Sequence, residues 1–393
     1  MNTKLHIRAN LIINLDIFAN IIMRIKAIIA SLLLFVSTHG GRPVCFEHRP
    51  DNLPSAAPLF TSDTLMIKMI GDVMIHTRQI ELAHVKDSTY DFSSYFSVIR
   101  DSLKNADICI ANMEFTTAGK PYTGYPAFSA PDSYIDYLAS CGIDVLLASN
   151  NHIYDKGCAG ASRTIRKIQS HNGLHLCGIA TDSVHLAQTN PLTIYRKGMS
   201  VSMVNFTYGT NLGADKHWPK INYMSDRKRI KNGLDRGSDS DLVMVFPHWG
   251  EEYTLLPSES QRATAQWLAE NGADVIIGTH PHVPQTFETV TENNIPVAYS
   301  LGNAVSNMSA ANTQMELMAT IRLVRRSNGD VEMLPIRFTY LWCSRPGGYG
   351  KSYTVIPVRE FIGKKDKWIG TWDYDKMIST YERVKETIKI EDN

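Results

Sequence analysis

Residues 274–285 read DVIIGTHPHVPQ: an apolar run ends at Gly278, and two histidines follow with one proline between them. The apolar run is typical of a buried strand that ends in a turn. His280 and His282 alternate, and Pro281 restricts its neighbour to an extended conformation, so we expect both rings to point to the same side. In α/β proteins, ligands bind at the carboxyl ends of strands. The stretch therefore predicts an α/β fold with a candidate metal-binding pair at one strand end.

Apolar runs of the same kind recur upstream and alternate with helical patterns. We expect strands at 65–70, 107–112, 145–149, 241–250 and 274–280, and helices at 92–106, 131–142, 159–173 and 259–272. Strands that alternate with helices predict an α/β fold whose sheet is covered by helices on both faces. Further short β runs between residues 286 and 340 predict a second sheet packed on the first, and the tail from Asp375 predicts a polar surface helix.

Polar side chains follow each of the five expected strands. An aspartate after a glycine is commonly a turn or cap residue, and a lone histidine is more often structural than a ligand. Chance places polar residues at one strand end far more often than at five in succession, so we interpret them as parts of one site. Carboxylate, amide and imidazole groups together suit a divalent metal, Mn²⁺, Fe²⁺ or Zn²⁺, as one ion or two. The polar residues are Asp72, Asn112, Glu114, Asn151, His152, His248, Glu252, His280 and His282.

Six motifs carry a family resemblance. In sequence order they are GDVM (71–74), ANMEF (111–115), SNNHIYDKG (149–157), HWGEEY (248–253), GTHPHVPQ (278–285) and YSLGNAV (299–305). Over residues 64–310 the chain resembles the CapA family, the poly-γ-glutamate capsule synthesis proteins. That family is similar in fold to the calcineurin-like metallophosphoesterases. The resemblance implies a metallo-dependent phosphatase-like fold, an α+β sandwich of two mixed β-sheets flanked by helices.

The resemblance also implies a role for each matched residue. His152 is expected to contact the transferred group. Glu252 is a candidate for orienting the attacking water, with a structural salt bridge as the alternative. The expected metal ligands are Asp72, Glu114, Asn151, His248, His280 and His282.

One position departs from the phosphoesterase pattern. Met74 stands where that pattern has a histidine, two residues after the aspartate. His76 would face the same side of an extended strand but lie about 6–7 Å further along it. Either one metal site is weaker or absent, or His76 compensates.

The composition and the N-terminus indicate which partners and which location to expect. The chain has 393 residues, with 40 Lys and Arg against 39 Asp and Glu. This balance provides no field that attracts nucleic acid, so we expect no nucleic-acid partner. Arg24 and Lys26 precede an apolar run at 27–36, which is the pattern of a signal peptide, with a buried core helix as the alternative. Export would place the protein in the periplasm or at the outer face of the cytoplasmic membrane.

We expect an extension and signal peptide over 1–42, a Pro-rich linker over 43–63, the main domain over 64–345 and a C-terminal extension over 346–393. Two functions remain open. The chain is a metal-dependent hydrolase or transferase acting on an anionic polymer or another cell-envelope substrate, or it is a non-catalytic component of a membrane complex that makes or exports capsule. The resemblance implies the capsule complex as a partner.

Overall fold

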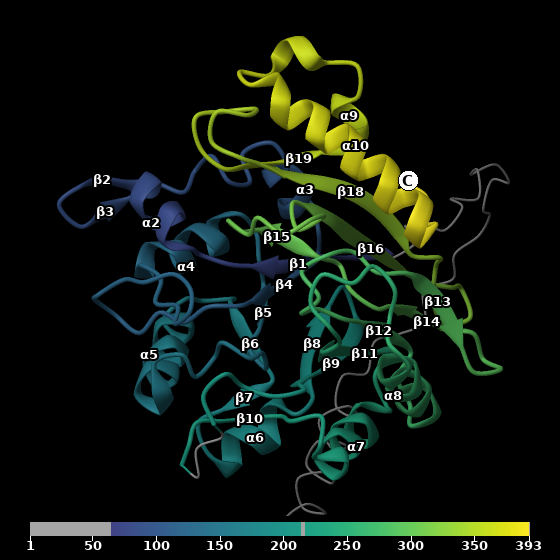
Figure 1. Cartoon of the computed structure of the whole chain (residues 1–393). Helices are drawn as coiled ribbons and strands as arrows, with labels where there is room; N and C mark the ends of the chain where they lie inside the picture. The colour runs from purple at the N-terminus through teal and green to yellow at the C-terminus, as the bar shows by residue number, and fades with distance from the viewer. Residues whose placement is uncertain (1–63, 214–216, 393) are drawn as a thin grey trace, which may run out of the picture. The chain divides into compact units, whose positions relative to one another are not determined.

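A computed structural model describes residues 64–213 and 217–392 of the chain. The expected signal peptide and linker lie outside the described residues. Two main β-sheets and the helices around them form the described part (Figure 1). Among the described residues, no helix combines the length and the apolar character needed to cross a membrane.

The larger sheet is mixed. Its strands are β1 (Thr64–Val73), β4 (Ile108–Met113), β5 (Val145–Leu147), β6 (His175–Cys177), β15 (Asn303–Val305), β16 (Met315–Arg325), β17 (Val331–Met333), β18 (Arg337–Ser344) and β19 (Thr354–Pro357). The order is β19-β18-β16-β1-β4-β5-β6, with β15 beside β1 and β17 beside β16. β1, β4, β5 and β6 are parallel, whereas β16, β18 and β19 pair in antiparallel fashion.

The second sheet is also mixed. Its strands are β8 (Leu192–Arg196), β9 (Met199–Thr207), β11 (Leu242–His248), β12 (Val275–Ile277), β13 (Phe287–Val290) and β14 (Ile295–Ala298), in the order β13-β14-β12-β11-β9-β8. The four inner strands are parallel, and the two edge strands are antiparallel to their neighbours. Short ladders join β2 (His84–Lys86) to β3 (Thr89–Tyr90) and β7 (Ile179–Ala180) to β10 (Lys220–Ile221).

Helices flank the two sheets. They are α2 (Thr77–Ala83), α3 (Arg100–Lys104), α4 (Asp132–Ser140), α5 (Gly157–Gln169), α6 (Ser183–Thr189), α7 (Arg227–Gly237), α8 (Glu259–Glu270), α9 (Val358–Phe361), the 3₁₀ turn Lys365–Lys367 and α10 (Thr371–Ile388). In Figure 1, α4 and α5 lie on the side of β4 and β5, and α7 and α8 lie beside the second sheet.

The alternation of side chains along β1 shows how the layers pack. Leu65, Ile67 and Met69 are buried in the core between the two sheets, whereas Ile70 and Val73 belong to the core beneath α4 and α5. A third core lies between the second sheet and the helices α7 and α8. Burying each such aliphatic side chain is worth about 1.5–3 kcal/mol. The expected architecture, two mixed sheets flanked by helices, is confirmed.

Three local expectations are wrong. The helix expected at 92–106 is a series of turns up to residue 99, and only α3 is helical. The C-terminal β runs do not form a sheet of their own, because β13 and β14 extend the second sheet while β16 to β19 extend the first. The tail helix α10 is not a polar surface helix, because Met377, Val384 and Ile388 are buried in the core between the sheets.

Candidate metal centre

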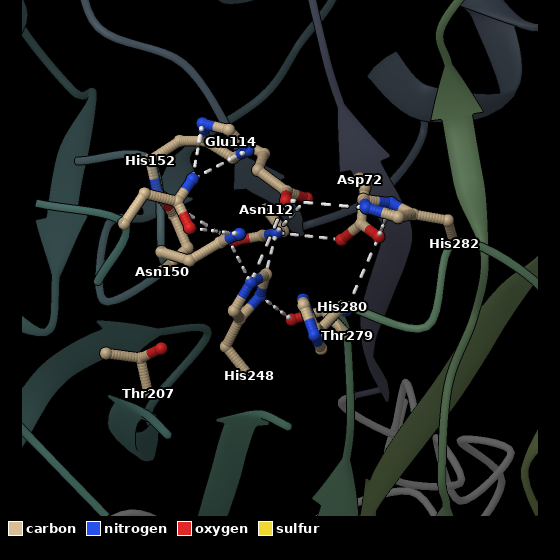
Figure 2. A network of polar contacts seen from close by, with 12 residues as sticks. Asp72, Asn112, Glu114, Asn150, His152, Thr207, His248, Thr279, His280 and His282 are labelled. Atoms are coloured by element: carbon tan, nitrogen blue, oxygen red, sulfur yellow. Dashed lines mark hydrogen bonds and ion pairs between the residues drawn. The ribbon is translucent and has the colours of Figure 1, made fainter. Parts of the chain in front are cut away.

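The candidate ligands converge because the two sheets place the carboxyl ends of their parallel strands at the same edge. Asp72 and Glu114 come from β1 and from the end of β4 in the larger sheet. His248 ends β11 in the second sheet, and His280 and His282 follow β12. Figure 2 shows these side chains turned toward one another from their separate strands. The five strand ends are therefore adjacent in space, although they belong to two sheets rather than to one.

A bulge at the end of β1 aims Asp72 into this space. The pairing register of β1 shifts between Ile70 and Asp72 against β4, and again after Asp72 against β15. The backbone N–H of Asp72 donates to Gly302 O at 2.9 Å. A Cβ on Gly71 would lie 1.9 Å from that same oxygen, so only glycine fits beside it. The N–H of Gly71 donates to the buried carboxylate of Glu316 at 2.6 Å.

Asp72, Glu114 and His282 form a first group, whose ligand atoms all lie within 4.8 Å of one another. His282 Nδ1 lies 3.3 Å from Asp72 Oδ2, and its Nε2 lies 3.8 Å from Glu114 Oε1. Asn303 Oδ1 lies 3.0 Å from His282 Nδ1. The Asn112 amide donates to Asp72 Oδ1 at 2.7 Å.

Glu114, His248 and His280 form a second group within the same limit of 4.8 Å, so Glu114 is common to both. His248 Nε2 lies 2.9 Å from Asn151 Oδ1 and 3.8 Å from Glu114 Oε1. Neighbouring ligand atoms lie about 3 Å apart around an ion whose bonds are about 2.1 Å long. The contact of 2.9 Å between Asn151 and His248 is a hydrogen bond that joins two of the expected ligands.

Glu252 occupies a different position. It lies in the loop after β11, is exposed, and forms a third group with His280 and His282 within 4.8 Å. The exposed ring of Tyr253 lies beside it, with its centroid 6.2 Å from that of His282. Glu252 thus stands at the mouth of the cluster, whereas Asp72 and Glu114 lie at its buried floor.

The backbone between the two histidines is not extended, and that expectation is wrong. His280 has φ 101° and His282 has φ 61°, both in the left-handed region that non-glycine residues rarely adopt. The ring centroids lie 5.9 Å apart. Each such residue costs about 1–3 kcal/mol, and strain of this kind is concentrated at functional sites.

Burial and the like charges of the carboxylates set the protonation of the cluster. Burial, and next the charge of Asp72, raise the pKa of Glu114 well above its usual range. Burial would lower the pKa of His282, but the carboxylates of Glu114 and Asp72 outweigh it and raise that pKa to about 9. Burial and the neighbouring His282 lower the pKa of His280 to about 3, and burial and His280 lower the pKa of His248 well below its usual value. At neutral pH the ring of His282 is therefore cationic, whereas the rings of His248 and His280 are neutral.

Two buried atoms show that the cluster fits a cation. Within the described residues, Glu114 Oε1 and His280 Nδ1 have no hydrogen-bond partner. A buried polar atom without a partner costs about 1–3 kcal/mol. A carboxylate oxygen and the free nitrogen of a neutral imidazole are both electron-pair donors, and a divalent metal ion would satisfy both at once.

His152 lies beside the ligand groups, in none of them. Its Nδ1 lies 2.8 Å from Asp155 Oδ2, which also accepts a hydrogen bond from the backbone N–H of Phe128 at 2.8 Å. The Phe128 ring packs edge-on against His152, with centroids 4.7 Å apart. Phe128 thus holds the imidazole in place.

Sequence reasoning missed Asp155 and gave Asn112 no separate role. Asp155 stands three positions after His152 in SNNHIYDKG, and this spacing brings its carboxylate to the ring within a turn. Asn112 stands at an expected strand end, but nothing in the sequence assigns it a role. Its position two residues before Glu114, on the same side of the chain, was the available signal.

Met74 and His76 do not restore the missing ligand. Met74 is buried in the core beneath α4 and α5. His76 begins α2, where its Nδ1 lies 3.2 Å from both Gln79 Oε1 and the backbone N–H of Asn307. Burial lowers the pKa of His76 to about 4. Among the described residues, His76 belongs to none of the three candidate ligand groups.

Comparison with known proteins identifies the family. Residues 66–308 match the family described as bacterial capsule synthesis protein PGA_cap. The chain is 28% identical over 291 residues to the capsule biosynthesis protein CapA of Bacillus anthracis, covering 70% of this chain and 68% of that protein. It is 26% identical over 290 residues to the PGA biosynthesis protein CapA of Bacillus subtilis strain 168, covering 70% and 72%.

Among solved structures, a 5'-nucleotidase precursor from Thermus thermophilus aligns at 10% identity with a TM-score of 0.44, over 82% of this chain and 59% of that one. The family match spans more than half of the present chain and includes each of the strand ends described above. The chain therefore belongs to the PGA_cap family of bacterial capsule synthesis proteins.

Proposed function

We propose that this protein is a metal-dependent hydrolase or transferase of the cell envelope that acts in the biosynthesis of a capsule or a related anionic polymer. One observation carries the proposal: buried carboxyl groups and imidazoles from two sheets converge, and Glu114 Oε1 and His280 Nδ1 have no hydrogen-bond partner among the described residues. The names of the relatives, which are capsule and PGA biosynthesis proteins, support the biological setting.

The residues that would hold the metal are those of the two buried ligand groups together with Asn151. When bound, Mn²⁺, Fe²⁺ or Zn²⁺ supplies a Lewis acid for a phosphoryl or carbonyl oxygen and lowers the pKa of water. Asn112 and Asn303 hold Asp72 and His282 in position through hydrogen bonds of 2.7 Å and 3.0 Å. Glu252 at the mouth is placed to orient a water molecule.

His152 is the residue placed to move a proton. Asp155 lies 2.8 Å from its Nδ1 and would fix the orientation of the ring, as the carboxylate of a catalytic triad does. The Nε2 atom is then the one that can give a proton to a leaving group. The Phe128 ring, packed against the imidazole, keeps this orientation and limits access of bulk water.

The setting follows from the same reasoning. We propose that the protein is exported and acts in the periplasm or at the outer face of the cytoplasmic membrane. Its substrate would be a phosphoester, an amide of an anionic polymer or a cell-wall fragment. A membrane complex that makes capsule is the proposed partner.

The test is metal analysis combined with turnover. Purified wild-type protein is expected to hold at least one divalent metal ion and to cleave a phosphodiester such as bis(p-nitrophenyl) phosphate or a γ-glutamyl p-nitroanilide. His280→Ala is expected to weaken metal binding by roughly 100-fold or more and to abolish turnover. His175→Ala, which changes an exposed histidine on β6, is the control and should keep both.

Two results would contradict the proposal. One is a purified protein without any divalent metal, and the other is turnover that His280→Ala leaves unchanged. Metal binding and polymer binding without turnover of either substrate would instead favour the non-catalytic role in a capsule complex.

A further inference from the structure

A cavity of about 190 Å³ opens beside the candidate metal centre. Tyr208 belongs to both: it lines the cavity, and its ring centroid lies 4.6 Å from that of His280. Trp249, which directly follows His248, forms another wall. A substrate held at the metal centre by its reacting group could therefore place the neighbouring group in this cavity.

The walls combine apolar surface with hydrogen-bonding groups. Tyr208, Trp249 and Met224 supply the apolar part. The Ser260 hydroxyl and the Glu251 carboxylate also line the cavity, and both side chains are exposed. They provide a hydroxyl that can donate or accept and a carboxylate that accepts only.

One wall is rigid. Gln261 accepts a hydrogen bond from the backbone N–H of Ser258 at 2.9 Å and donates to Gln285 Oε1 at 2.8 Å. Gly250 lies against it, and a Cβ at that position would come within 2.6 Å of the Gln261 amide. The cavity is therefore preformed on this side, which favours a ligand of defined shape.

The charge of the cavity disfavours an anionic occupant. Within the described residues, no lysine, arginine or histidine lines it. Glu251 stands in its wall, and Glu252 follows at the mouth of the metal centre. A polymer segment with its own carboxylates would meet like charges here without a compensating cation.

We propose that this cavity is a substrate subsite for a neutral, hydroxyl-bearing ring of the sugar class. This inference rests on the proposed function, because the ring would be linked to the group that reacts at the metal centre. The apolar C–H face of such a ring packs on the exposed ring of Tyr208. Its hydroxyls donate to Glu251 and bond with Ser260. The volume suits a single ring, because pockets for drug-sized ligands measure about 300–1,000 Å³.

The test is a titration of the metal-loaded protein with N-acetylglucosamine, followed by the fluorescence of tryptophan. Saturable binding is expected for the wild type, weakened at least tenfold by Tyr208→Ala and by Ser260→Leu, which fills the cavity. Ser379→Leu, at an exposed position of α10, is the matched control and should bind like the wild type. Tri-γ-glutamate should not displace the sugar.

The inference is overturned if the wild type shows no saturable binding, if both cavity variants bind as the wild type does, or if tri-γ-glutamate displaces the sugar. Metal content and cleavage of bis(p-nitrophenyl) phosphate are measured on the same samples. A protein that holds metal and cleaves the ester but ignores the sugar refutes the subsite alone. A protein that holds no metal refutes the proposed function, and the subsite with it.

Discussion

The buried carboxyl of Glu316 makes the protein less stable as the pH rises, and one isosteric change should remove this effect. Glu316 Oε1 accepts the hydrogen bond from Gly71, while Oε2 has no partner among the described residues. Burial raises the pKa of Glu316 from 4.5 to about 8, although the bond from Gly71 acts in the opposite direction. Because the folded pKa is the higher one, this contribution to stability is complete below pH 4.5 and is lost as the pH rises through 8.

The size of the effect follows from the two pKa values. For each pH unit between the two pKa values, the free energy of unfolding falls by about 1.4 kcal/mol. The whole interval therefore gives an upper bound of about 5 kcal/mol. Relaxation of the surroundings reduces such burial costs, so we expect a value on the order of 2–5 kcal/mol. Glu316→Gln keeps an acceptor for Gly71 and cannot ionise.

The assay is urea denaturation of both proteins with a chelator present. At about pH 5 the free energies of unfolding should be similar, and at about pH 8.5 the Gln variant should be the more stable. Glu382→Gln, at an exposed position of α10, is the control and should show no pH-dependent difference. A difference between Glu316→Gln and the wild type that is the same at both pH values would refute the reasoning.

Three further outcomes can be measured on the same protein. Gly71→Ala forces a Cβ to 1.9 Å from Gly302 O, so we expect a loss of about 3 kcal/mol or more in urea denaturation, together with loss of metal. Asp373→Ala removes the buried carboxylate that accepts a hydrogen bond from the Ser344 hydroxyl at 2.6 Å. We expect the free energy of unfolding to fall by about 2–4 kcal/mol. The control Asp375→Ala, at an exposed position, should lower it by less than about 0.5 kcal/mol. A divalent metal at 100 times its Kd should stabilise the wild type by about 2.7 kcal/mol and raise the thermal midpoint by several degrees; an unchanged midpoint after chelation would contradict a metal centre.

Which residues approach one another could be predicted from the sequence, because a ligand at the end of an apolar run has a definite place in an α/β fold. The local geometry could not. His280 and His282 alternate around a proline, which favours an extended chain, yet both adopt a positive φ. Tertiary contacts impose that conformation, and they cannot be predicted from the local sequence of residues 278–282.

The assignment of strands to sheets was equally inaccessible. β16 pairs with β1, although the two strands lie far apart in the sequence. The apolar pattern of β16 does not distinguish it from a strand of the other sheet. Glu316 is a lone glutamate within that apolar pattern, and only the pairing shows that it meets Gly71. In α10, Met377, Val384 and Ile388 lie at helical spacing among charged residues, and the excess of polar residues hid the buried face.

The division of the ligands between the two sheets has a consequence for the order of folding. Asp72 and Glu114 precede His248 and His282 by more than a hundred residues, so neither of the two buried ligand groups lies within a short segment. The sheets must dock before an ion can bind tightly, and loop closure over such distances is slow. A metal ion would then be the last component to enter. Its binding would stabilise only the state in which the two sheets are docked. It should therefore slow the separation of the two sheets more than it speeds their association.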